Sequence, residues 1–152
     1  MAATNPAPTR PRHGVVRVDS LMADDTLYLR LWGEPIAQPR PRARLASHGG
    51  RILVYDPSTR FKAAAQLLVG AALDEIGVRQ RPVFASGRSV KITAHYFTAD
   101  TRKDIDNLLK FTMDILQGPI CNDDRHVVEV RAHKHHEPAS EQVRTDVEVE
   151  YL

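Results

Sequence analysis

Alternating apolar and polar residues predict several β-strands along this chain. In residues 26–33, Leu27, Leu29 and Leu31 fall on one side of an extended backbone, and the residues between them fall on the other. The remaining predicted strands, from the same period or from a short apolar run, are residues 51–56, 88–97, 126–134 and 145–152.

Two segments show helical spacing instead. Residues 56–77 open with the capping candidates Asp-Pro-Ser, repeat apolar side chains every three or four positions, and end at Gly77. A second helix is expected from near Asp106 to just before Gly118. Residues 33–50 are rich in proline and glycine and are expected to form a long loop. The order ββαβαββ predicts one two-layer α+β domain, a mixed β-sheet with two helices covering one face.

The first 25 residues show no clear period. We expect residues 1–25 to form a flexible N-terminal tail, outside a domain that spans residues 26–152. A transit-type segment for organellar targeting is the alternative interpretation, because the Pro-rich opening contains arginines and no acidic residue.

Composition narrows the class of protein only moderately. The single cysteine, Cys121, excludes an intramolecular disulfide and indicates a reducing compartment. No apolar run reaches the roughly 18 residues that a membrane helix needs. We therefore expect a cytoplasmic protein without a membrane partner. The formal net charge of +2 permits a nucleic-acid partner but does not require one.

The segment KDIDNLLK, residues 103–110, is the strongest chemical signal. Helical residues two apart point about 200° away from each other, so Asp104 and Asp106 converge only if Asp104 lies in an extended lead-in to the helix. Two carboxylates gathered there would suit a hard cation such as Mg²⁺. Because Asp106, Lys110 and Asp114 recur every four residues, a solvated, salt-bridged helix face is the alternative interpretation.

A second acidic pair, Asp123 and Asp124, precedes the strand at 126–134. The second helix is about 16 Å long, so the chain must return to the helix N-terminus if either aspartate is to join the first pair. The strand at 126–134 would then lie beside the strand that ends near Phe97.

The stretch DIDNLLKFTMDILQGPICNDDRHVVEVRAHK resembles the RusA family of Holliday-junction resolvases, whose signature runs D-x-D-N-x-x-K, D-A/I-L, a turn, D-D and a strand with a downstream lysine. Upstream, GEPIAQPRPR is similar to the opening of several members. The resemblance covers roughly residues 27–152. It implies a RusA-like fold and a structure-specific, nucleoid-associated endodeoxyribonuclease. Such an enzyme resolves four-way DNA junctions by paired symmetric nicks in recombination and repair, acting as a homodimer.

The resemblance also implies roles for individual residues. Asp104, Asp106 and Asp124 match metal-binding, catalytic carboxylates, and Lys110 matches a catalytic lysine. Asn107 and Asp123 match neighbouring polar residues. The implied cofactor is Mg²⁺, with Mn²⁺ as a substitute. Apart from the resemblance, we expect the phosphates of branched DNA to be held by the positive charges near the aspartates, namely Arg40, Arg42, Arg44, Arg102, Lys103 and Lys134.

The residues themselves fit phosphodiester hydrolysis, because charge gathers on the phosphate and on the leaving 3′-oxygen. A module that binds branched DNA without cutting it is the first alternative. A nucleotide-sugar transferase is the second, although such enzymes need a larger nucleotide-binding region. The histidines of AHKHHE lack the partners of a usual zinc site, and surface or phosphate-facing roles are favoured for them.

Overall fold

A computed structural model describes residues 14–39, 41–45, 50, 52–85 and 87–152 of the chain. The elements in this part of the chain are β1 (Arg17–Ala23), β2 (Thr26–Trp32), β3 (Arg42–Leu45), β4 (Ile52–Tyr55), α1 (Thr59–Glu75), β5 (Val90–Thr98), α2 (Ile105–Leu116), the 3₁₀ turn η1 (Asp124–His126), β6 (Val127–His136) and β7 (Arg144–Tyr151). No helix in these ranges is long and apolar enough to cross a membrane.

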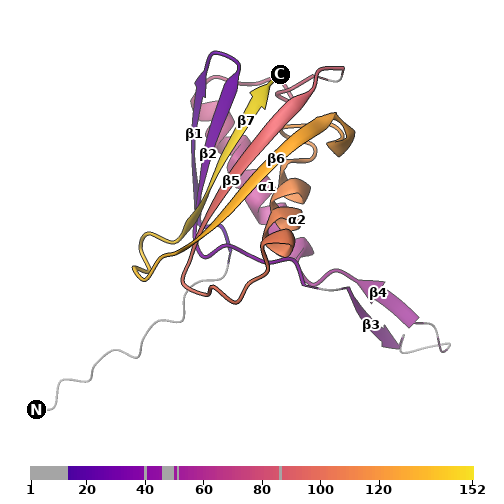
Figure 1. The fold of residues 1–152 in the computed structure, drawn as a ribbon. Coiled ribbons are helices and arrows are strands. Elements are labelled where there is room, and N and C mark those ends of the chain that lie inside the picture. Colours follow the sequence, from indigo (N-terminus) through magenta and orange to yellow (C-terminus); the bar gives the residue numbers. More distant parts are fainter. Residues whose placement is uncertain (1–13, 40, 46–49, 51, 86) are drawn as a thin grey trace, which may run out of the picture.

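Five strands form one mixed sheet in the order β1-β2-β7-β5-β6, and both helices lie on the same face of it (Figure 1). The alternating residues of β2, β5 and β7 bury one side against α1 and α2, as the two-residue period predicts. The expectation of a two-layer α+β domain with two helices over one sheet face is confirmed.

The helix α2 connects two parallel strands. β5 and β6 pair in parallel, so that Val90 at the start of β5 lies beside Val127, and Tyr96 near its end lies beside Lys134. The chain can enter β6 in this direction only by crossing back along the sheet, which α2 does. The segment that leads into α2 therefore lies at one end of the sheet, and the segment that leads into β6 lies at the other end (Figure 1).

Two strands fall where none was expected. β1 lies within the stretch assigned to a flexible tail, yet it pairs with β2 along its whole length. Its inward positions are Val18, Ser20 and Met22, and the serine interrupts the apolar alternation that would have revealed the strand. The Ser20 hydroxyl is satisfied by donating to the Ala72 carbonyl at 2.7 Å.

β3 lies within the expected long loop. It pairs only with β4, and the two form an arm that projects from the domain (Figure 1). Leu45 of β3 and Val54 of β4 do not contribute to the core, since both are more than 70% exposed. Pairing with β4 rather than burial of an apolar face accounts for this strand, and alternation cannot reveal such pairing.

Candidate active site

Two aspartates stand at the entry of α2. Asp104 is the residue before the helix and has extended dihedrals, φ −72° and ψ 134°, while its carbonyl accepts the first helical hydrogen bond from Leu108 at 3.1 Å. Asp106 lies in the first turn, where its carboxylate accepts from the Asn107 amide at 2.9 Å. Both side chains are exposed. The prediction that Asp104 precedes the helix in an extended conformation is confirmed.

Asp123 and Asp124 lie at the opposite end of α2. Asp123 accepts from the backbone and the guanidinium of Arg125 at 2.9 and 2.7 Å, and these bonds, the backbone one first, hold the pKa of Asp123 below its usual range. Asp124 opens the η1 turn and is exposed. Because Asp123 uses its carboxylate to hold the turn, Asp124 is the better candidate of the two for a metal ligand.

One chain does not gather all three expected carboxylates. The 12-residue helix α2 begins directly after Asp104, contains Asp106 in its first turn and ends before the connection that holds Asp124; its length is about 18 Å. In agreement, the described ranges contain no group of three or more His, Cys, Asp and Glu side chains that could hold a metal ion. The sequence pattern suggested that β6 could return to the helix N-terminus, but a parallel crossover starts β6 at the helix C-terminus.

Lys110 lies one turn after Asp106, is exposed, and has no ion-pair partner among the described residues. The salt-bridged helix face expected as the alternative is not what the structure shows, because the Asp114 carboxylate pairs with Lys62 of α1 at 2.7 Å. The same ammonium group lies 2.6 Å from the Asp56 carboxylate. The α2 surface that holds Asp106 therefore retains a lysine that is not neutralised by Asp114.

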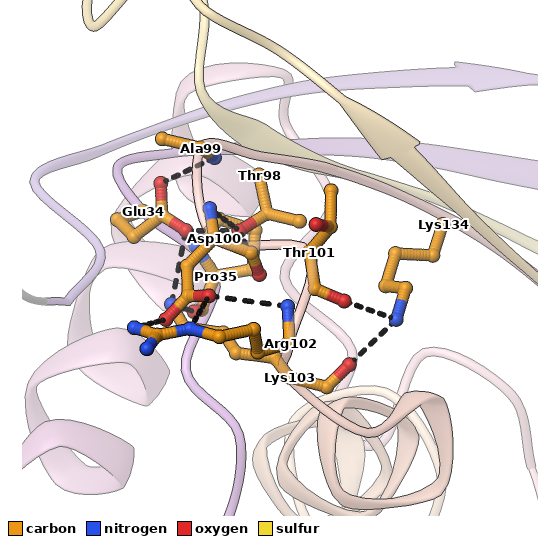
Figure 2. Close-up of polar contacts among 9 residues, drawn as sticks. All are labelled: Glu34, Pro35, Thr98, Ala99, Asp100, Thr101, Arg102, Lys103 and Lys134. Carbon is orange, nitrogen blue, oxygen red and sulfur yellow. Dashed lines mark hydrogen bonds and ion pairs between the residues drawn. The ribbon is translucent and has the colours of Figure 1, made fainter.

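A buried carboxylate holds the segment that leads into Asp104 (Figure 2). Glu34 is only 5% exposed. It accepts hydrogen bonds from the Thr98 hydroxyl, from the Ala99 amide at 3.2 Å and from the Lys103 ammonium at 2.9 Å. Burial opposes the ionisation of Glu34, but the bonds that it accepts, beginning with that from Thr98, outweigh this cost and lower its pKa.

Sequence reasoning missed Glu34, since nothing in the letters GEP distinguishes a buried acid from an exposed one. Three of the cations expected to bind DNA belong to the same region. Lys103 also donates to the Pro35 carbonyl at 2.5 Å, and Lys134 donates to the carbonyls of Thr101 and Lys103, both at 2.8 Å (Figure 2). Arg102 pairs with Asp100 at 2.9 Å, although its side chain is 90% exposed.

Two of the three remaining expected DNA contacts are on the arm. Arg40 lies outside the described residues, and Arg42 and Arg44 belong to β3, where the structure describes only their backbone. The arm begins at the active-site end of the molecule, because the Gln38 amide donates to the Asn107 carbonyl at 2.9 Å. Cys121 is buried, and burial raises the pKa of its thiol to about 11, so it is unsuited to act as a nucleophile.

The fold and this site define a class of two-layer α+β domain in which the helix of a parallel crossover presents carboxylates at its N-terminus. A family model described as endodeoxyribonuclease RusA matches residues 33–150. The chain belongs to the RusA endodeoxyribonuclease family, and this membership indicates an enzyme that cleaves DNA internally. It is also 27% identical to YqaN of Bacillus subtilis (strain 168), described as an uncharacterized protein, over 81% of this chain and 94% of that one.

Proposed function

We propose that this protein is a Mg²⁺-dependent endonuclease that resolves four-way DNA junctions by paired symmetric nicks in recombination and repair. The observation that carries the proposal is the exposed pair Asp104 and Asp106 at the entry of α2, with Lys110 one turn later, which pairs with no acid in the described part of the chain. These residues lie within the part of the chain that matches the endodeoxyribonuclease family.

The donor atoms fit a hard divalent cation, because carboxylate oxygens are the ligands that Mg²⁺ and Mn²⁺ prefer. Asp104 and Asp106 would hold it. When bound, such an ion neutralises phosphate charge and lowers the pKa of an attacking water. Lys110 is placed to approach a phosphate oxygen or the leaving 3′-oxygen. Asn107 and Asp123 would support the neighbouring carboxylates, and the products would carry 5′-phosphate and 3′-hydroxyl ends.

We further propose that Asp124 reaches this site from a second copy of the chain. Within one chain Asp124 lies at the far end of α2, but a two-fold axis that sets two α2 helices antiparallel brings the end of one beside the start of the other. The edge formed by β6 and α2 offers apolar surface for such contact, since Val128 and Val130 are 60% and 40% exposed. A homodimer of this kind would present two sites related by symmetry, as two matched nicks require.

The DNA would be held mainly by the arm. It carries Arg42 and Arg44, follows Arg40 in the chain and projects from the domain (Figure 1). It leaves the domain beside Asn107, whose carbonyl accepts from the Gln38 backbone N–H. Arg102, which is exposed before Asp104, is a further candidate for phosphate contact. Each phosphate neutralised by a cation should contribute about 0.9 to the slope of log affinity against log salt. For Lys103 and Lys134, the contacts described above favour a different role.

The first experiment incubates the protein with a labelled mobile four-way junction, with and without Mg²⁺, beside a linear duplex of the same sequence. The proposal predicts symmetric nicks that are confined to the junction and depend on the metal ion. Equal cutting of the duplex, or cutting in EDTA, would refute it. Binding of the junction without nicks, whatever the divalent ion, would support the alternative of a module that binds branched DNA without cutting it. The separation of Asp124 from Asp104 within one chain favours this alternative.

A second experiment tests the shared site by mixing two inactive variants, Asp106→Asn and Asp124→Asn. If Asp124 acts in the partner's site, each mixed dimer contains one site with both aspartates intact, and the mixture regains single-strand nicking. If Asp124 acts in its own chain's site, every site in the mixture carries one substitution. The absence of regained nicking, with subunit exchange verified by labelled chains, would refute the shared site.

A further inference from the structure

We propose that Glu34 and Lys134 are positioning residues. They form hydrogen bonds to the segment Thr98–Lys103 from two sides and so fix Asp104 at the entry of α2. This inference rests on the proposed function, in which Asp104 binds the metal ion. In this role neither residue contacts DNA or the metal ion. Their effect would pass through the backbone of the segment that Figure 2 shows between them.

Glu34 forms hydrogen bonds to both the start and the end of the segment. Its carboxylate accepts from Thr98 and Ala99 at the start and from Lys103 at the end, so that the six residues of the segment form a closed loop. Lys103 is held twice, because its ammonium also donates to the Pro35 carbonyl. Since Glu34 is almost fully buried, its carboxylate is shielded from water, and the hydrogen bonds that it accepts restrict both ends of the segment.

The backbone at Gly33 places Glu34 in this position. Gly33 has a φ of +127°, and a Cβ atom there would lie 2.1 Å from the Gly14 carbonyl oxygen. Its amide donates to the Val143 carbonyl at 3.1 Å. The turn after β2 is thus fixed against two other segments of the domain, and only glycine fits it.

Lys134 forms hydrogen bonds to the opposite side of the segment. It lies on β6 beside Tyr96 of β5, and its ammonium donates to the carbonyls of Thr101 and Lys103. The Lys103 carbonyl belongs to the peptide bond that joins Lys103 to Asp104, so this contact is one peptide from the proposed metal ligand. A lysine that satisfies two backbone carbonyls has one of its three donors left for other partners.

The same region also holds the first turn of α2. The backbone N–H of Gln38 donates to the backbone carbonyl of Asn107. Gln38 lies four residues after Glu34 in the chain. The stretch from Gly33 to Gln38 therefore contacts the chain on both sides of Asp104. Mutation of groups that orient metal ligands typically costs about 10- to 100-fold in metal affinity or activity.

The test compares Lys134→Met with its conservative partner Lys134→Arg and with Arg79→Met, which removes one positive charge from the exposed loop after α1. Cleavage of the junction is measured against Mg²⁺ concentration, and junction affinity is measured in EDTA over a range of salt. We expect Lys134→Met to cut about 10- to 100-fold more slowly and to need more Mg²⁺ for half-maximal rate. Its affinity and salt slope should match those of Arg79→Met, and Lys134→Arg should recover part of the rate.

A phosphate contact by Lys134 gives the opposite pattern. In that case the salt slope of Lys134→Met falls by about 0.9 relative to Arg79→Met, and the Mg²⁺ requirement stays unchanged. That result overturns the proposal. Glu34→Gln provides the second variant, with its melting temperature checked first, and it should show the same raised Mg²⁺ requirement with unchanged affinity in EDTA.

Hydrogen exchange of the protein alone separates this inference from the proposed function. Peptides that cover residues 98–108 should exchange faster in Glu34→Gln and Lys134→Met than in Arg79→Met, without DNA or metal ion. Unchanged exchange overturns the positioning role whether or not the protein cuts junctions. A wild-type protein that fails to cut refutes the proposed function instead, and the exchange result then still decides whether the two residues hold the segment.

Discussion

Replacement of Lys62 by methionine is expected to destabilise the protein measurably, because this lysine joins three parts of the helical layer. Its ammonium lies 2.6 Å from the Asp56 carboxylate, in the turn before α1, and 2.7 Å from the Asp114 carboxylate of α2. The Lys62 side chain is only 15% exposed, whereas the two carboxylates are 26% and 35% exposed. Methionine preserves most of the apolar stem and removes the charge.

The magnitude can be worked from the Asp56 carboxyl group. Burial opposes its ionisation, but the hydrogen bonds from Lys62 and Ser58 outweigh this and lower its pKa from 3.8 to about 2. At 1.36 kcal/mol for each pKa unit, such a change corresponds to about 2 kcal/mol of stability. Solvent screens a group that is a quarter exposed, and Ser58 supplies part of the effect. We therefore expect Lys62→Met to lower the free energy of unfolding by about 1–2 kcal/mol.

The effect should depend on pH in a definite direction. A carboxyl group whose pKa is depressed on folding stabilises the protein above its unfolded pKa, and this contribution is lost as pH falls toward the folded pKa. The stability difference between wild type and Lys62→Met should therefore shrink between about pH 5 and about pH 2. The raised pKa of Lys62 acts only in the alkaline range and does not affect this comparison.

The assay is urea unfolding at neutral and acid pH, with Arg60→Met as the control. Arg60 lies on the same helix and is exposed, so its replacement should change stability by less than about 0.5 kcal/mol. For a chain of this size, the expected loss in Lys62→Met corresponds to about 2–8 °C in melting temperature. Equal stability of Lys62→Met and Arg60→Met at neutral pH, or a difference that grows in acid, would refute the reasoning.

Three further outcomes follow from the site and the core. Asp106→Asn should abolish cleavage while junction affinity in EDTA is kept or raised, because a carboxylate that repels phosphate is lost; equal loss of both would contradict its metal-binding role. Tyr96→Phe should cost about 1 kcal/mol in urea unfolding, since the buried Tyr96 hydroxyl donates to Thr112 at 2.8 Å; no change would show that this bond contributes nothing net. If the proposed homodimer forms through β6 and α2, Val130→Arg should dissociate it in sedimentation experiments and abolish cleavage, and a dimer that persists would place the interface elsewhere.

Local periodicity predicted most of this fold, because the main strands and both helices each bury one regular face. It failed at β1, where Ser20 occupies an inward position, and at β3, whose pairing with β4 replaces burial. The N-terminal pair of aspartates could be placed because helix geometry relates neighbouring residues. Glu34 could not be found, since its burial depends on Thr98 and Lys103, which are more than 60 residues away in the chain.

The position of Asp124 shows how topology changes the interpretation of a motif. The pattern D-x-D-N-x-x-K followed by D-D reads as one cluster along the sequence, but the helix between its two parts runs from one end of the sheet to the other. In this chain the connection after α2 leads directly into η1 and the start of β6, which lies beside the start of β5, so Asp124 stays at the end of the sheet opposite Asp104. If all three carboxylates serve one metal site, the second part must come from another chain. Dimerisation would then be a condition for chemistry, as well as the source of the symmetry that matches a four-way junction.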